Sequence, residues 1–224
     1  MGAAQRAPKA GLRILAYEAL KAAIAEMDIY GRPDEVRLDE SKLSRDLGMS
    51  RTPVREAFVV LEHEGLIRSE ARRGVFVVKK TKVEAVGIMH AWAALASMAA
   101  RLACECATDD ELASLRGSFL DVCSESSAEC NADRTDASLR FHLAIIALSR
   151  CETIQRLSST VLVHVKGIHQ VILKPTARRA RAFKDSSRIV EALQGRDAVA
   201  AGQLVIAYGL EIAAHIHLHN EFLD

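Results

Sequence analysis

The sequence predicts a mainly α-helical chain in two parts: three short helices with a small β-hairpin, and then an all-α antiparallel helical bundle. Three observations support this fold class. Gly and Pro are scarce, at 12 and 4 of 224 residues, as expected where helix dominates. The stretch Ser50–Glu56 begins a helix directly after a glycine-containing turn. From Val83 onward only helical apolar patterns follow.

The first part contains three predicted helices. Apolar residues recur at helical spacing over 12–27, with charges on the other face. Residues 28–37, which contain Gly31 and Pro33, read as a loop. Asp39 can cap a short helix that Gly48 can end. Ser50 can cap the third helix, which Gly65 ends.

A basic-tipped hairpin follows the third helix. Leu66-Ile67 and Val75–Val78 are short β-type runs, joined by a turn whose tip is Arg72-Arg73-Gly74. Three helices followed by such a hairpin make a winged helix-turn-helix, the form of many DNA-binding domains. We therefore expect this domain over residues 1–80, with the helix-turn-helix at about 40–59.

The second part is expected to be an all-helical domain over residues 81–224. Lys79–Lys82 is the expected hinge. Thr108 and Glu111 have the spacing of a capping box. Pro175 and the pair Gly195/Asp197 mark helix boundaries. The predicted helices cover about 83–103, a stretch starting at 108, 131–149, 152–173, 177–194 and 198–219.

The amino-acid composition indicates where the protein is found and what kind of partner it binds. The five cysteines show no C-x-x-C spacing and follow no signal peptide, which favours reduced thiols in a cytoplasmic protein. The longest run without Asp, Glu, Lys or Arg is Ala85–Ala100, 16 residues, and a membrane span needs about 20 apolar residues, so we expect a core helix and no membrane partner. Residues 1–82 carry a formal charge of +4 and the remainder −3, which weakly favours a nucleic-acid module at the front.

The candidate DNA-binding residues lie on the third helix, its neighbour and the hairpin. Arg51 and Arg55 are one helical turn apart, and arginine forks suit guanine O6/N7 or phosphate. A basic wing tip can reach a backbone or minor groove, where a glycine permits close approach. Two arginines alone would favour a solvated helix face, but the complete helix-turn-helix and wing favour DNA. The predicted set is Arg45, Ser50, Arg51, Thr52, Arg55, Arg72, Arg73 and Gly74.

Within this pattern the sequence resembles a known family. Residues Leu43–Ala57, with Leu61, Glu62, Glu64–Leu66 and Arg72–Gly74, resemble the DNA-binding signature of the GntR family of bacterial transcription regulators. The helical remainder, through Ala103–Leu112, Phe141-His142 and Ile189–Asp197, is similar to the FadR-type subfamily with its all-helical effector (FCD) domain. The resemblance implies a homodimer, a double-stranded operator and a small-molecule effector. The sequence shows no glycine-rich phosphate loop, nucleophile elbow or converging carboxylate pair, so we expect no enzyme.

The resemblance also implies a metal site that this chain lacks. Many members of the subfamily bind a divalent metal through the Asp and His of a D-x-x-x-H pattern and two later histidines. Here His142 remains, but the other positions fall on Ser138, Ser186 and Tyr208. One imidazole is too few ligands for such a site, so we expect no metal and no cofactor. The candidate effector-binding residues are Trp92, Ser138, His142, Ser186 and Tyr208.

Other histidines and a basic run are weaker candidates. His164 and His169, five residues apart, point about 140° apart on a helix and do not converge. His215 and His219 share a face, where a surface or dimer contact is expected. A basic run opens the helix after Pro175 and favours solvated charge over an anion site: Arg178, Arg179, Arg181 and Lys184. The alternative to a ligand-responsive regulator is a constitutive architectural DNA-binding dimer with a decayed pocket.

Overall fold

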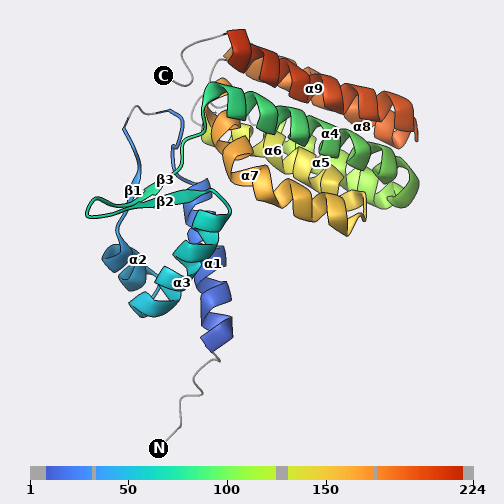
Figure 1. Cartoon of the computed structure of the whole chain (residues 1–224). Coiled ribbons are helices and arrows are strands. Elements are labelled where there is room, and N and C mark those ends of the chain that lie inside the picture. The colour runs from blue at the N-terminus through green and yellow to red at the C-terminus, as the bar shows by residue number, and fades with distance from the viewer. Residues whose placement is uncertain (1–8, 32–33, 125–130, 174–175, 219–224) are drawn as a thin grey trace, which may run out of the picture. The chain divides into compact units, whose positions relative to one another are not determined.

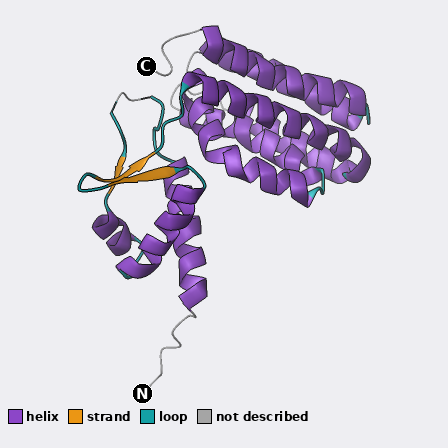
Figure 2. Cartoon of the chain, in the orientation of Figure 1, coloured by secondary structure: helices purple, strands orange, loops and turns teal. Residues whose placement is uncertain are grey.

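The computed structural model describes residues 9–31, 34–124, 131–173 and 176–218, without the side chains of 9–10, 117–136 and 176–183. The chain forms two compact units, Met1–Lys79 and Lys80–Asp224 (Figure 1). The first unit holds α1 (Lys9–Ala25), β1 (Arg37–Leu38), α2 (Glu40–Asp46), α3 (Arg51–His63), β2 (Ile67–Glu70) and β3 (Gly74–Val77). The second holds α4 (Lys82–Cys106), α5 (Asp109–Ser124), α6 (Asn131–Leu148), α7 (Glu152–Ile172), α8 (Thr176–Gln194) and α9 (Ala198–Leu218). The predicted fold class is confirmed, helical throughout apart from one small sheet (Figure 2).

The helices of the first unit pack through the buried stripe of α3. Pro53, Val54, Ala57, Phe58 and Leu61 are all buried on one side of this helix. They follow the 3.6-residue period, so the residues between them are exposed except Val60, which is half-buried. Helix α1 packs against α3, which fixes the orientation of the exposed face within this unit.

A cluster of polar side chains ties α1 to the end of α3. Lys21 Nζ donates to Tyr17 Oη at 2.7 Å and to Glu64 Oε2 at 2.9 Å. Tyr17 in turn donates to Glu64 Oε1 at 2.6 Å. Burial, and then the hydrogen bond to Glu64, raise the pKa of Tyr17, so its hydroxyl stays a donor at neutral pH.

The sheet has three strands rather than the two of the predicted hairpin. Its order is β1-β3-β2, with both pairs antiparallel. Arg37 and Leu38, at the end of the segment predicted as a loop and just after it, pair with Phe76 and Val75. A two-residue strand shows no alternating pattern, and here the strand exists because β3 offers a second edge for backbone hydrogen bonds.

Several predicted helix ends are confirmed. Asp39 accepts from the backbone N–H of Lys42 at 2.9 Å, and Gly48 has φ +61°. Thr108 and Glu111 form the predicted reciprocal capping box, with bonds of 2.8 and 3.2 Å. Ser50 occupies the N-cap of α3, but its side chain makes no capping hydrogen bond to a described residue, contrary to the prediction.

The segment predicted as a hinge carries the start of α4. Thr81 is the N-cap of this helix, and Thr81 and Glu84 form a full capping box. Glu84 Oε2 accepts from the Thr81 backbone N–H at 2.9 Å, and Thr81 Oγ1 accepts from the Glu84 N–H at 3.3 Å. Helix α4 therefore begins at Lys82, inside the expected hinge.

Helices α4 and α9 form the closest pair of the bundle. A Cβ added to Gly209 would lie 2.5 Å from the Cβ of Ala93, and one added to Gly202 would lie 2.5 Å from Arg101 Nε. Ser97 Oγ donates to the Gly202 carbonyl at 2.8 Å in a buried position. Small residues therefore let the two backbones approach.

The turn between α8 and α9 lies where Gly195 and Asp197 predict a helix boundary. Its left-handed residue is Arg196, with φ +57°. The guanidinium of Arg196 donates to the carbonyls of Cys104 and Ala107 at 3.0 and 2.6 Å and pairs with Asp109. These bonds satisfy carbonyls at the end of α4. Their favourable free energy offsets the conformational strain of an arginine with positive φ.

Both α4 and α9 are long and apolar enough to cross a membrane by length and composition alone. Core helices pass the same test, and these two pack against each other along their length. Their buried residues include Trp92 and Met89 of α4 and Val205 and Ile212 of α9. We therefore interpret them as core helices of the bundle.

Candidate nucleic-acid interface and ligand site

The exposed face of α3 carries the predicted reading residues. Arg51, Thr52 and Arg55 are exposed, while Pro53 and Val54 between them are buried. Proline in the first turn has no intrahelical hydrogen bond to lose. The first two turns of the helix therefore expose two arginines and one threonine hydroxyl on one side.

A surface hollow of about 420 Å³ lies beside the start of α3. Its lining combines basic side chains with hydroxyl groups, and one lining residue, Ser44, is buried. Basic and hydroxyl groups beside a helix N-terminus suit a phosphate oxygen. The lining residues are Ser41, Ser44, Arg45, Gly48, Met49, Ser50 and Arg51.

Arg55 is held by a residue that the sequence did not single out. Its Nε donates to Glu40 Oε2 at 2.9 Å, while 67% of the Arg55 side chain remains exposed. Glu40 begins α2, so the two helices of the helix-turn-helix are linked through the candidate reading residue. The only signal in the sequence was an acidic residue fifteen positions before an arginine, which is too general to be informative.

The two arginines of the wing tip differ in their surroundings. Arg73 pairs with Glu70 and Glu35, and its guanidinium lies 5.5 Å from the ring centre of Phe76. Arg72 is exposed, has φ +65°, and makes no hydrogen bond or ion pair within the described part of the chain. Arg72 is therefore available for contact with a partner, whereas Arg73 contributes to the structure of the wing.

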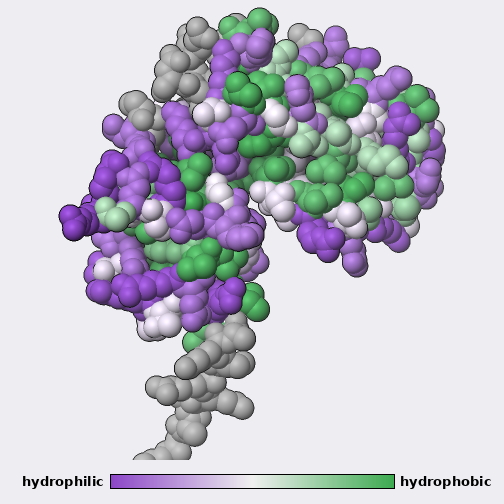
Figure 3. All heavy atoms as spheres, in the orientation of Figure 1, coloured by the Kyte–Doolittle hydropathy of each residue, from purple (hydrophilic) through white to green (hydrophobic). Residues whose placement is uncertain are grey.

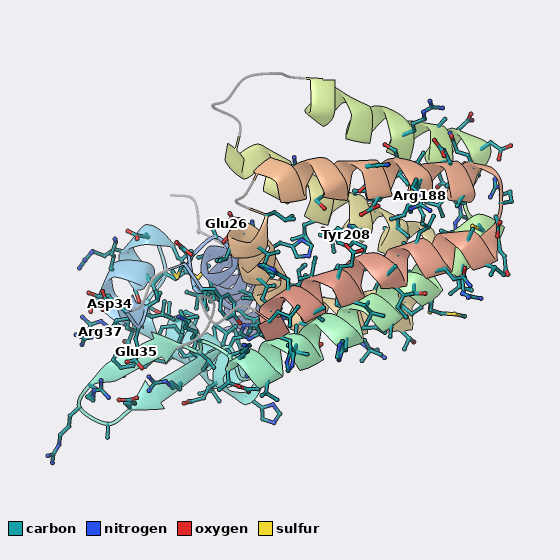
Figure 4. The ribbon with its side chains drawn as sticks, turned by 90° about the horizontal axis from the view of Figure 1, so that it is seen from above. Glu26, Asp34, Glu35, Arg37, Arg188 and Tyr208 are labelled. Carbon is teal, nitrogen blue, oxygen red and sulfur yellow. The ribbon has the colours of Figure 1, made fainter. Side chains whose placement is uncertain are left out.

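Gly74 follows this tip with φ +118°, a conformation that other residues rarely adopt. A Cβ there would lie 2.9 Å from Arg37 Nε on β1. The glycine is thus required by the wing itself, whatever approaches it. Figure 4 labels Arg37 of β1 together with Asp34 and Glu35, which lie just before this strand.

In the helical unit, three of the five predicted effector residues meet in the core. Ser138 Oγ lies 3.0 Å from Tyr208 Oη. The rings of His142 and Tyr208 stack with centroids 4.5 Å apart and planes 21° apart. His142 Nδ1 lies 2.8 Å from the Ser138 carbonyl. Helices α6 and α9 bring these side chains together, and Tyr208 lies among the helices in Figure 4.

His169 of α7 joins this group and was missed by sequence reasoning. Its ring contacts the edge of Tyr208 with centroids 6.0 Å apart, and the residue has no exposed surface. We call Ser138, His142, His169 and Tyr208 the histidine–tyrosine cluster. His169 falls at none of the positions that the family resemblance points to, and only the packing of α7 places it here.

The rings of this cluster are uncharged at neutral pH. Burial lowers the pKa of His142 to about 4 and that of His169 to about 3. Burial likewise raises the pKa of Tyr208 to about 12, against a smaller lowering by the Ser138 hydrogen bond. The cluster is therefore a set of neutral donors and acceptors.

The other two predicted effector residues are also buried in the helical unit. Trp92 and Ser186 are each 1% exposed, on α4 and α8. His164 is buried, and the nearby charges of Lys80 and Glu84 act on it, whereas His169 faces Tyr208. The side chains of Arg178, Arg179 and Arg181, and residue His219, lie outside the described residues, while Lys184 is exposed and His215 half-buried. Among the residues with described side chains, no three His, Cys, Asp or Glu gather as a metal site requires.

A winged helix-turn-helix and a separate helical unit in one chain define the class of two-domain bacterial transcription regulators. The chain belongs to the GntR family: residues 16–77 match the model of the bacterial regulatory proteins of the gntR family, and residues 87–211, more than half of the chain, match the FCD domain. The resemblance seen in the sequence is confirmed. This family is one of DNA-binding transcription regulators, not of enzymes.

Individual relatives agree with this assignment. The chain is 35% identical over 122 residues to the Nta operon transcriptional regulator of Aminobacter aminovorans, spanning 54% of this chain and 57% of that protein. It is 26% identical over 184 residues to the uncharacterized HTH-type transcriptional regulator YdhC of Bacillus subtilis, covering 79% of each.

Solved structures share the fold. A GntR transcriptional regulator from Rhodococcus sp. RHA1 has a TM-score of 0.73 at 23% identity, over 92% of this chain and 98% of that one. E. coli McbR/YncC has a TM-score of 0.72 at 21% identity, with the same coverage. At these identities the likeness concerns the fold alone.

Proposed function

We propose that this chain binds a pseudo-palindromic operator as a homodimer and changes its DNA affinity when a small-molecule metabolite binds its helical domain. Helix α3 enters the major groove, and Arg72 at the wing tip contacts the backbone or minor groove. The protein acts in the cytoplasm and uses no divalent metal. Residues 1–80 form the DNA-binding domain and 81–224 the effector and dimer domain.

The observation that carries the proposal is the division of α3 into two faces. Five residues from Pro53 to Leu61 are buried on one face, and Arg51, Thr52 and Arg55 are exposed on the other side. Beside them lies the hollow lined by Arg45 and Ser50. This combination of base-reading forks and phosphate-binding groups at the start of one helix suits a major-groove contact.

Exposed apolar side chains in the helical unit support the dimer. Figure 3 shows apolar surface on the visible face of this unit. Met98 of α4, Leu157 of α7 and Leu210 of α9 are 49%, 47% and 44% exposed. Apolar surface of this kind favours contact with a second copy. Light scattering of the purified chain is expected to give twice the monomer mass of 24.4 kDa, and a monomer at micromolar concentration contradicts the dimer.

The DNA proposal is tested by operator selection followed by one substitution. Selection from random duplexes is expected to yield two half-sites about one helical turn apart. Arg55→Ala is expected to weaken binding to the selected operator by about 1–3 kcal/mol. Arg156→Ala, which removes an exposed arginine from α7, is the matched control and leaves affinity unchanged. Equal affinities for all three proteins contradict the assignment of α3.

A second function, an effector-independent architectural DNA-binding dimer, is favoured by the contacts within the cluster. Ser138, His142 and Tyr208 stand at the family's ligand positions and here contact one another. A metabolite screen separates the two functions. The regulator requires a compound that raises the melting temperature of the helical unit and alters operator affinity, and the architectural protein requires that none does.

A further inference from the structure

The core of the helical unit contains polar atoms that no described residue satisfies. They include His142 Nε2, both ring nitrogens of His169 and Trp92 Nε1, each of them buried. A buried polar group without a hydrogen bond costs roughly 1–3 kcal/mol. Native proteins carry few such groups, and several in one core indicate that something else meets them.

The tautomer of His142 follows from its neighbour. Its Nδ1 lies 2.8 Å from the carbonyl oxygen of Ser138, and a carbonyl can only accept a hydrogen bond. Nδ1 therefore carries the proton, and Nε2 presents a bare lone pair to the core. A partner for this atom must donate an N–H or an O–H.

Donors accompany this acceptor. Trp92 Nε1 can only donate, and neutral His169 offers one donor and one acceptor. His142 and His169 contact the same ring, that of Tyr208, so both lie within the length of one small molecule. Trp92 comes from α4, which packs against α6, α7 and α9. Its neighbour Ala93 meets Gly209, the residue after Tyr208.

The charges described around the cluster disfavour an anion. The rings stay neutral, because burial lowers the pKa of both histidines and raises that of Tyr208. The charged side chain that acts on Tyr208 is Asp185, which is negative. A carboxylate placed here would lose its hydration and gain no cation from the described cluster.

We propose that this core binds an uncharged small molecule whose N–H or O–H group donates to His142 Nε2 and whose acceptor is met by His169 or Trp92. This inference rests on the proposed sensing function of the helical domain and narrows its ligand to one chemical class. Primary or secondary amides, lactams and N–H heterocycles belong to that class, and carboxylates do not.

The test uses the full chain and a set of small amides, each paired with its carboxylic acid of the same skeleton, such as benzamide with benzoate. Ligand-observed NMR and thermal shift report binding. Hits are expected among the amides, with at least a tenfold preference over the paired acid. Hits among the acids, or none in either series, overturn the proposal.

A second measurement follows the acceptor atom itself. In protein labelled with ¹⁵N-histidine, the Nε2 signal of His142 is expected to be that of an unprotonated nitrogen. It moves upfield when an amide donates to it, which a purely structural histidine would not do. His142→Phe assigns the signal and is expected to abolish amide binding, and His169→Phe weakens it. His90→Phe, on the exposed side of α4, is the control and binds normally.

The outcomes separate this inference from the proposed function. If His142→Phe does not fold, the amide–acid preference and the Nε2 shift of the unmodified chain still decide. Amide binding without any change in operator affinity supports the ligand class and contradicts the sensing function. Operator release by a carboxylate alone supports sensing and contradicts the ligand class. Binding of ordered water only, with an unmoved Nε2 signal for every amide, also contradicts it.

Discussion

Arg55 of α3 donates from Nε to Glu40 Oε2 of α2 at 2.9 Å. A guanidinium bound through Nε keeps both terminal nitrogens for a bidentate contact with guanine O6 and N7. Glu40 is mostly shielded, with 25% of its side chain exposed, whereas 67% of Arg55 is exposed. The carboxylate therefore orients the Arg55 guanidinium in the free protein, which would lower the entropy lost in the proposed contact with DNA.

Replacing Glu40 by Gln is expected to lower the ratio of operator affinity to random-DNA affinity by about two- to five-fold, the worth of an exposed ion pair. Arg55 then loses its fixed orientation, while one negative charge fewer strengthens non-specific binding. Fluorescence anisotropy with both duplexes measures the ratio. Glu56→Gln removes the same charge from the exposed face of α3 and controls for it. A ratio that falls equally in both variants contradicts an orienting role.

The two wing arginines are expected to respond differently to alanine substitution. Arg72→Ala weakens DNA binding and reduces the salt slope by roughly one, because one phosphate contact is lost. Its melting temperature stays unchanged. Arg73→Ala also removes the pairs with Glu70 and Glu35, so it destabilises the first unit by about 1 kcal/mol. The double variant flattens the salt dependence further. An unchanged salt slope in the double variant shows that the wing is not on phosphate.

The glycine at the α4–α9 contact is expected to tolerate no methyl group. In Gly209→Ala the new Cβ lies 2.5 Å from that of Ala93, so the helices must separate, at a cost of about 1–3 kcal/mol. Gly87→Ala, on α4, is the matched control. A Cβ added to Gly87 would have no other atom within 4 Å. That variant is expected to gain about 0.5–1 kcal/mol from helix propensity. Urea denaturation followed by the fluorescence of Trp92, the single tryptophan, measures both.

Acid is expected to destabilise the helical unit well before it denatures ordinary bundles. The pKa of His142 falls from 6.5 to about 4 on folding, so its neutral form contributes fully above pH 6.5. As pH falls toward 4 the unfolded chain takes up the proton first, and on the order of 3 kcal/mol is lost. His169 adds a loss of the same sign. Urea titrations monitored through Trp92 from pH 7.5 to 4.5 are expected to show this decline. A curve for His142→Phe as steep as that of the unmodified chain argues against it.

Metal removal is expected to leave the protein unchanged. EDTA should not lower the melting temperature, and added Zn²⁺ or Mn²⁺ should not raise it, because Ser138, Ser186 and Tyr208 replace the carboxylate and imidazoles of the family's site. Elemental analysis of the purified protein should find less than one metal ion per ten chains. A stoichiometric metal that EDTA removes with loss of stability contradicts the metal-free proposal.

Local signals explain why the helices could be predicted. Asp39, Thr108 and Glu111 cap their helices as their spacing predicts, because a cap depends on residues three or four apart. The capping box of Thr81 and Glu84 carries the same signal, and it was missed because the lysines around it favoured a hinge.

Features set by packing could not be predicted in this way. Strand β1 forms through its pairing with Phe76 and Val75, residues almost forty positions away. His169 reaches Tyr208 because α7 packs in the bundle, and its angle to His164 along the helix says nothing about a ring on α9. The Arg196 cap likewise joins residues about ninety positions apart.

The close approach at Ala93 and Gly209 has a consequence for signalling. Only hydrogens and the methyl group of Ala93 separate the two backbones at this point, so the helices cannot slide past each other without a steric clash. We therefore expect α4 and α9 to move as one rigid unit. Arg196, just before α9, links the two helices at one end, because its guanidinium donates to the carbonyls of Cys104 and Ala107 at the end of α4. Adjustment to the proposed ligand at His142 and His169 would then fall on α6 and α7, the helices that carry those rings. Because α4 begins directly after the capping residue Thr81, any rotation of the α4–α9 pair would carry the first residues of the second unit with it.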